Sequence, residues 1–199
     1  MYPGQSPMVV AQTNVKVAVP PASETMGLRR AKNYLYVTHN EDDDLITDMI
    51  RDSRQYIEDA TGYVALTMTI VQYWDGFPAY GGPIEVGRRP LQSVDSLSYT
   101  GTDGISHTMT PTDYGLDTAG DPPRITLAHS SAWPVAASRP LPVVSAQIVV
   151  GNPDVRSVPS NFIRAQLVLM AHWYDKRADP PPPGLLDYLI ADLAETPTR

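Results

Sequence analysis

The chain has 199 residues, a formal net charge of −7 and no cysteine. This length suits one domain, with or without an insertion, and allows a sizeable core without covalent cross-links. The absence of cysteine excludes disulfides, thiolate metal sites and a cysteine nucleophile. The acidic balance argues against coating nucleic acid or an anionic membrane surface. No apolar run approaches the roughly 20 residues of a membrane span, so we expect no membrane partner.

Residues 1–22 are assigned to an N-terminal arm. Prolines near both of its ends bracket a stretch in which Val15, Val17 and Val19 alternate with other residues. Such a stretch can add a strand to another sheet. The alternative is a terminus without fixed structure.

Residues 23–62 are predicted to form the first part of a helical core. Ser23 suits a helix N-cap, although Gly27 weakens that first helix. A second helix is predicted to start at an Asn40 cap and to stop at Gly62. Its apolar stripe comprises Leu45, Ile46, Met49, Ile50, Ser53, Tyr56, Ile57 and Ala60, and its polar face comprises Asp48, Arg51, Asp52, Gln55, Glu58 and Asp59.

Residues 63–151 change to a period of two. Short strand-like runs are separated by turn signals such as Asp75-Gly76, Gly81-Gly82 and Asp103-Gly104. Regular short strands with such breaks are typical of antiparallel β structure. We therefore predict an α+β fold: a helical core of two N-terminal helices and a buried C-terminal helix, with an inserted antiparallel β-sandwich or barrel-like subdomain.

Residues 152–178 return to a helical pattern. The stretch from Phe162 to Tyr174 is apolar around nearly its whole circumference, which predicts a helix buried on every side, by its own subunit or by a neighbour. Residues 179–199 form a proline hinge, Pro180 to Pro183, and a short C-terminal arm or helix. That helix carries an apolar stripe at Leu185, Leu186, Leu189, Ile190 and Leu193.

The sequence contains no catalytic signature, and we predict that the protein is not an enzyme and needs no cofactor. His39, His107, His129 and His172 are scattered and show no metal-ligand spacing. Four consecutive acids at residues 41–44 fit a helix N-terminus better than a calcium loop. His172 is expected to be a packed, hydrogen-bonded residue.

The order of several short segments resembles the bacteriophage head–tail connector proteins, also called adaptor or head-completion proteins, in the subset with a β insertion in a helical core. These segments are "DGFP" at 75–78, "RRPLQSV" at 88–94 and "AHWYDKR" at 171–177. The resemblance spans about residues 24–195. It implies a virion neck protein that forms a ring, commonly dodecameric, beneath the portal. Such a ring extends the DNA channel and offers a docking face to the next neck, stopper or tail protein.

The resemblance gives two groups of residues an expected role. The subunit core and the packing of the ring are assigned to Leu45, Ile46, Met49, Ile50, Ile57, Phe162, Leu167, Met170, Trp173 and Tyr174. Contact with the portal is assigned to the stripe at Leu185, Leu186, Leu189, Ile190 and Leu193. Acidic side chains facing the channel would let DNA pass without tight binding.

Two alternatives belong to other functional classes. The first is a carbohydrate- or partner-binding β module of a virion fibre or baseplate, which would present coplanar aromatic rings on its β face and would not need the buried C-terminal helix. The second is a small hydrolase, for which the sequence gives no motif. The order helix, β structure, helix favours the connector over both.

Overall fold

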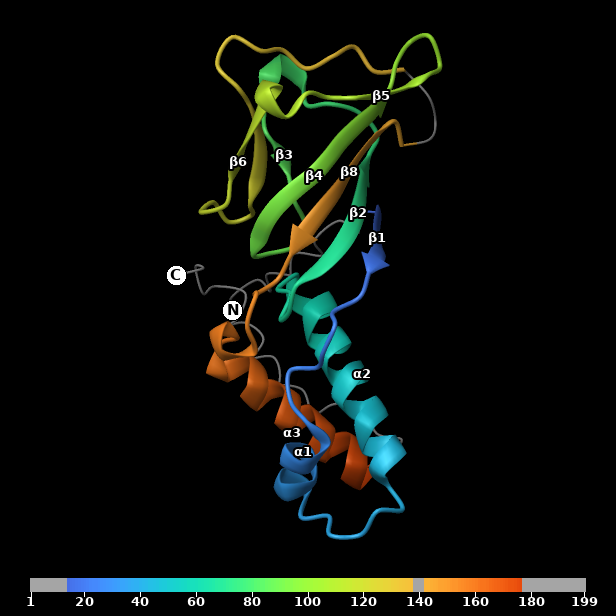
Figure 1. Cartoon of the computed structure of the whole chain (residues 1–199), viewed down its shortest axis with the longest axis vertical. Coiled ribbons are helices and arrows are strands. Elements are labelled where there is room, and N and C mark those ends of the chain that lie inside the picture. The colour runs from blue at the N-terminus through green and yellow to red at the C-terminus, as the bar shows by residue number, and fades with distance from the viewer. Residues whose placement is uncertain (1–13, 138–141, 177–199) are drawn as a thin grey trace, which may run out of the picture.

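The computed structural model describes residues 14–137 and 142–176. Helices gather at one end of an elongated molecule and β-sheets at the other (Figure 1). The α-helices are α1 (Leu28–Leu35), α2 (Asp43–Thr61) and α3 (Ser160–Lys176), and short 3₁₀ turns lie at Ala79–Gly81, Pro111–Asp113 and Val155–Ser157. The predicted α+β class with an antiparallel β subdomain between helical parts is confirmed, and the β part is an open pair of sheets rather than a closed barrel.

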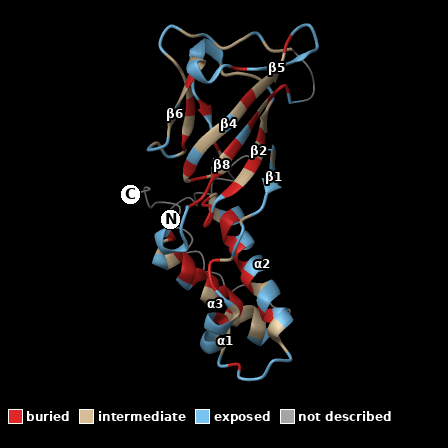
Figure 2. Cartoon of the chain, viewed as in Figure 1, coloured by how far each residue is buried: buried red, intermediate tan, exposed pale blue. Residues whose placement is uncertain are grey.

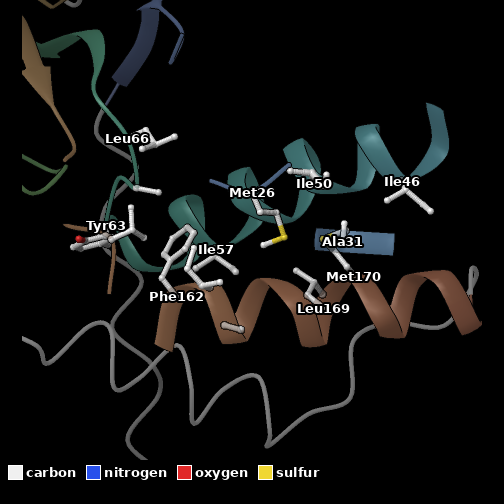
Figure 3. Packing of buried hydrophobic residues seen from close by; sticks show 14 of the residues in the cluster. Met26, Ala31, Ile46, Ile50, Ile57, Tyr63, Leu66, Phe162, Leu169 and Met170 are labelled. Atoms are coloured by element: carbon white, nitrogen blue, oxygen red, sulfur yellow. The ribbon is translucent and has the colours of Figure 1, made fainter. Parts of the chain in front are cut away.

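The helical end has its own hydrophobic core. Met26, Ala31, Ile46, Ile57, Phe162 and Leu169 are among its buried members, and they fill the space between the three helices (Figure 3). α2 forms where apolar residues recur every three or four positions, so one stripe faces α3 and the opposite face stays in water. Figure 2 shows this division as buried inner and exposed outer helix faces.

α1 begins later than Ser23, the cap that the sequence predicts. Gly27 is the residue before its first turn and has extended backbone. The preceding residues are held by tertiary contacts: Met26 is buried in the core, and the Thr25 hydroxyl donates a hydrogen bond to Gln166 Oε1 at 2.6 Å. These contacts, together with the low helix propensity of glycine, keep residues 23–27 out of the helix.

The start of α2 also differs from the prediction by a few residues. α2 starts at Asp43 after Asp42, whereas Asn40, the predicted cap, accepts a hydrogen bond from Lys32 Nζ at 2.9 Å. Asp43 and Asp44 occupy the first turn, where the partial positive charge of the helix end favours carboxylates. The predicted stop at Gly62 is confirmed: its φ of 71° is left-handed, and its N–H donates to the Glu58 carbonyl.

The β end consists of two antiparallel sheets. The larger sheet has the order β1-β2-β8-β4-β5, and the smaller has the order β3-β7-β6. The strands are β1 (Asn14–Val19), β2 (Met68–Trp74), β3 (Ile84–Glu85), β4 (Leu91–Thr100), β5 (Ser106–Thr108), β6 (Tyr114–Asp117), β7 (Arg124–Leu127) and β8 (Val144–Val150). Burial alternates along β2 and β8 because one face of the sheet packs on a second core of apolar side chains.

Strand β1 belongs to the stretch for which the sequence leaves two interpretations open. Its partner is the chain's own β2, with Val15 opposite Gln72 and Val17 opposite Ile70. The strand lies at the edge of the large sheet, and Val17 and Val19 remain more than half exposed. Residues 14–19 are therefore an edge strand of this subunit.

A narrow joint connects the two ends of the molecule. The chain enters the β subdomain after Leu66 and leaves it at Gly151, and Thr67 N–H donates to the Asn152 carbonyl at 3.0 Å. The Asn152 amide donates to Tyr63 Oη at 2.7 Å and to the Ala65 carbonyl at 2.9 Å. These two crossing segments are thus bonded to each other, and the chain between β1 and α1 makes a third crossing.

Candidate assembly surfaces

The residues that the sequence assigns to the subunit core or to ring packing fall into three classes. Ile46, Ile50, Ile57, Phe162 and Met170 are buried between the helices (Figure 3). Met49, Leu167, Trp173 and Tyr174 are partly buried against the same core. Leu45 is exposed. A neighbouring subunit can reach only the second and third classes.

The residues assigned to portal contact lie outside the described part of the chain. This applies to Leu185, Leu186, Leu189, Ile190 and Leu193, and equally to the proline hinge before them. Their role is therefore treated as a proposal below.

A groove runs along the flank of α2 where α3 ends. It has a volume of about 430 Å³ and is lined by Leu45, Asp48, Met49, Asp52 and Trp173. The Tyr56 ring stands edge-on to the Trp173 indole, with the ring centroids 6.0 Å apart. The surface is thus apolar, open and edged by two carboxylates, and we call it the α2–α3 groove.

Beside this groove, α2 presents an acidic ridge to solvent. Asp44, Asp48, Asp52 and Asp59 are exposed, and the first three follow one another at four-residue steps, so they lie along one side of the helix. Arg51 lies among them and pairs with Asp48 at 2.9 Å and Asp52 at 3.5 Å. The ridge keeps a net negative charge.

A buried ion cluster lies on the other flank of α2. The Arg54 guanidinium bonds Glu24 at 2.7 and 3.1 Å and Glu58 at 2.7 Å, and the Arg54 and Glu58 side chains are almost fully buried. Glu58 also accepts the Ala65 N–H at 2.9 Å. The cluster therefore joins the segment before α1, the helix α2 and the start of the β subdomain.

Two opposing effects set the protonation of this cluster. Burial raises the pKa of the Glu58 carboxyl, while the charge of Arg54 and the Ala65 N–H oppose that rise. Burial alone would lower the pKa of Arg54, but the hydrogen bond to Glu24 and the charges of both carboxylates raise it. Arg54 therefore stays charged and needs its carboxylate partners inside the protein.

Sequence reasoning missed these buried polar residues. It placed Glu58 on the solvent face of the helix, which is wrong, because that face turns toward the joint near the end of α2. It also gave no role to Gln166 in a stretch described as apolar around nearly its whole circumference. Gln166 is fully buried because its amide donates to the Ile50 carbonyl at 2.8 Å and accepts from Thr25. One feature of the sequence could have indicated the ion pair: Arg54 and Glu58 have opposite charges, are four residues apart and lie next to the apolar stripe.

The aromatic residues of the β subdomain support its loops. Phe77 and Trp133 stack face to face, with centroids 5.0 Å apart and planes 9° apart, and Tyr99 packs against the edge of Phe77. The Trp133 indole N–H donates to the Gly82 carbonyl at 2.8 Å. These rings cover one another, whereas the carbohydrate-binding alternative requires a row of rings open to solvent.

The described residues, 14–137 and 142–176, hold no group of three or more His, Asp or Glu side chains placed to bind a metal ion. His39 lies beside Glu41, and His107 lies beside Asp103 at 3.0 Å, each on the surface. Over the same residues, no helix has the length and apolarity needed to cross a membrane.

Comparison with known proteins gives one family and a consistent set of folds. Residues 25–110, which run from the segment before α1 to just beyond β5, match the family described as phage gp6-like head-tail connector protein. No curated protein sequence matches the chain significantly. The resemblance drawn from the short sequence segments is confirmed by this family match.

Solved structures with the same fold cover nearly the whole chain. A chain in the neck of an empty gene transfer agent (GTA) particle, computed with C6 symmetry, matches with a TM-score of 0.74 and 15% identity over 90% of this chain and 94% of that one. A chain in the virion of the native particle gives 0.73 and 14% over 90% and 94%. A chain in the native neck, computed with C12 symmetry, gives 0.68 and 18% over 91% and 93%.

Proposed function

We propose that this chain, whose residues 25–110 belong to the phage gp6-like head-tail connector family, is a structural head-to-tail connector subunit of a virion neck. The family match carries the proposal because it includes α1, α2 and the strands β2 to β5. The likeness of the whole fold to chains of gene transfer agent particles supports it further. The protein acts by assembly, and we assign it no reaction and no cofactor.

The subunit works as part of a ring. The similar chains come from necks computed with C6 and C12 symmetry, and these are symmetries of closed rings. A cyclic ring uses heterologous interfaces, so each subunit needs two different complementary surfaces. The exposed and half-buried apolar residues around the α2–α3 groove supply one of them. We propose a dodecamer.

The ring lies between the portal and the next neck, stopper or tail protein, and DNA passes through it. The acidic ridge of α2 suits the wall of such a channel, because carboxylates repel the phosphates of DNA and leave it free to slide. No tight DNA site is needed for this role. The β module alternative is less consistent with the structure, since α3 is central to the helical core.

Contact with the portal is assigned to the C-terminal segment. Four prolines in an extended conformation advance about 3.1 Å each, so Pro180 to Pro183 can carry the following residues roughly 12 Å from α3. Leu185, Leu186, Leu189, Ile190 and Leu193 then form a narrow apolar stripe suited to a groove on a partner. A helix this short is marginal alone in water, so it needs a surface to bind.

The test is the mass of the purified protein, measured alone and after mixing with a portal ring. We expect a discrete complex whose added mass is a multiple of the subunit mass. Truncation after Arg177 should keep the subunit folded and abolish the complex. A truncated protein that unfolds at lower temperature would instead assign the C-terminal segment to the subunit's own core. A full-length protein that never joins the portal would rule out the connector role.

A further inference from the structure

The outer face of α1 carries an unusual set of exposed residues. Arg29 and Arg30 project into solvent, and neither forms an ion pair within the described residues. Tyr34 is 43% exposed and Tyr36 is 93% exposed. Arginine and tyrosine are the residue types enriched where protein interfaces gain most of their affinity.

Tyr36 is also unusual in its backbone. It follows the last turn of α1 in the left-handed conformation, with φ 56° and ψ 32°. Glycine is the usual residue at such a position because a side chain makes the left-handed conformation unfavourable. A large tyrosine that is strained and almost fully exposed gains nothing inside its own subunit, which points to a contact outside it.

This basic, aromatic face and the α2–α3 groove lie on opposite flanks of α2. The segment before α1 and α1 itself contact α2 through Glu24 with Arg54 and through Lys32 with Asp43. The groove is lined from α2 by Leu45, Asp48, Met49 and Asp52. At about 100° of rotation per residue, the two sets lie roughly 180° apart around the helix axis. One subunit therefore cannot fill its own groove with its own α1.

We propose that the α1 face of one subunit docks in the α2–α3 groove of the next subunit around the ring. Arg29 and Arg30 then meet the groove carboxylates Asp48 and Asp52, and Tyr34 and Tyr36 cover the apolar floor beside Trp173. The occupant is a second copy of this chain because both halves of the match, basic with acidic and aromatic with apolar, are present on each subunit. The inference rests on the proposed ring, and it adds which surface of each subunit faces which surface of its neighbour.

The arrangement divides the acidic ridge of α2 between two uses. Asp48 and Asp52 lie in the proposed contact, and Asp44 and Asp59 are the exposed ridge carboxylates outside the groove. Repeating the contact around a closed ring turns Asp44 and Asp59 the same way in every subunit. The proposed DNA channel requires that they face the axis.

Charge reversal tests the contact. The variants Arg29→Glu/Arg30→Glu and Asp48→Arg/Asp52→Arg should each weaken ring assembly on the portal by at least about tenfold, because like charges then face each other. The variant with all four changes should recover most of the lost assembly, because each subunit brings both reversed faces. Assembly is read by mass, and the matched control is Asp75→Arg/Asp95→Arg, which makes the same charge change at two exposed positions of the β subdomain.

Tyr36→Gly separates an interface role from a structural one. Glycine relieves the left-handed backbone, so the thermal midpoint of the isolated subunit should stay the same or rise. Assembly should nevertheless weaken, since the exposed ring is lost. A variant that is equally stable and assembles as well as the parent would remove Tyr36 from the interface.

The absence of cysteine makes a direct test clean. In a variant with Arg30→Cys and Asp52→Cys, mild oxidation of assembled particles should link subunits into a ladder ending in a closed ring. The pair Arg30→Cys with Asp95→Cys should not. If the wild-type protein forms a ring, the charge-reversed variants assemble equally well and the cysteine variant gives no ladder, this contact is wrong and the connector role remains. A wild-type chain that forms no ring with its portal overturns both.

Discussion

Arg54 and Glu58 hold opposite charges inside the molecule, at the junction of the helical end and the β subdomain. Removing two ions from water is unfavourable, and their attraction offsets that penalty only when hydrogen bonds complete the geometry. Here Glu24 and the Ala65 N–H provide those bonds. The intact cluster therefore adds little net stability, but removing one of its members is strongly destabilising.

We expect Glu58→Ala to lower the free energy of unfolding by about 3–5 kcal/mol, because it leaves Arg54 buried with a single partner and the Ala65 N–H without an acceptor. Urea unfolding followed by circular dichroism measures the change. Glu41→Ala is the control, since that carboxylate is largely exposed, and it should change stability by no more than about 0.5 kcal/mol. Equal effects of the two substitutions would show that the cluster contributes little.

Gly151 is the second residue on which the joint depends. Its φ is +98°, and a Cβ placed on it would lie 2.2 Å from the Leu66 carbonyl oxygen, which is backbone and has little room to shift. We expect Gly151→Ala to destabilise the protein by more than about 2 kcal/mol. Gly76→Ala, where nothing lies within 4 Å, is the matched control. Similar thermal midpoints for the two variants would contradict the crossing described here.

Among the elements, α3 is the one for which the sequence left two kinds of burial open. The helix is apolar around most of its circumference, yet Leu167 and Val168 are only half-buried and Arg164 is exposed. Its buried side, with Phe162, Leu169 and Met170, packs on α1 and α2. Of the two arrangements that the sequence left open, the described residues therefore favour the one in which a single side of α3 packs on the helices of its own subunit.

This asymmetry gives a graded prediction. Leu169→Asp should reduce stability by more than about 3 kcal/mol, because an unpaired charge would be enclosed by the core. Leu167→Asp should have a clearly smaller effect on the isolated subunit, since its side chain reaches solvent. Thermal unfolding of both variants gives the comparison. If Leu167→Asp is as damaging as Leu169→Asp, the outer side of α3 is covered within the subunit itself.

The sequence was sufficient for elements whose pattern is local and insufficient for those fixed by distant partners. The stripe through Ile46, Ile50 and Ile57 predicts α2 and its buried face, and alternating residues predict the strands. The pairing of β8 between β2 and β4 depends on segments far apart in the chain. The burial of Gln166 depends on Thr25 and Ile50, more than a hundred residues away, and no local pattern contains that information.

The same limit applies to the assembly surfaces. Leu45, Met49 and Trp173 were correctly chosen as apolar residues on helices. The sequence could not show which of these residues face the core and which line a groove, because their exposure depends on how far α3 extends along α2. The sequence did not predict a contact surface on α1 either. Exposed arginines are common on helices, and only the structure shows where these two lie relative to the groove.

At the scale of the whole molecule, charge is the property with the widest effect. The subunit has a net charge of −7, and the ridge of α2 concentrates part of it along one line. A ring that presents this ridge to its axis creates a negative channel, which repels DNA rather than holding it. The joint keeps α2 in a fixed relation to the β subdomain.

The isolated protein should accordingly show no submicromolar, salt-sensitive affinity for duplex DNA in a filter-binding assay. A variant with Asp44→Lys on the ridge and Gln55→Lys beside it leaves the α2–α3 groove unchanged and should add measurable binding that falls as salt rises. In assembled particles the same variant should slow DNA release. Tight, salt-sensitive binding by the unaltered protein would contradict a repelling channel.

The joint has a consequence for how such proteins can diversify. Thr67 and Asn152 are hydrogen-bonded neighbours, so the inserted segment between them begins and ends at one place on the helical body, while β1 joins its sheet from the N-terminal side of α1. A segment whose two ends meet can be lengthened, trimmed or replaced without moving the elements on either side of it. The sequences of the helices and of the inserted β segment are therefore free to change at different rates. A ring with unchanged helices can then carry a different β segment.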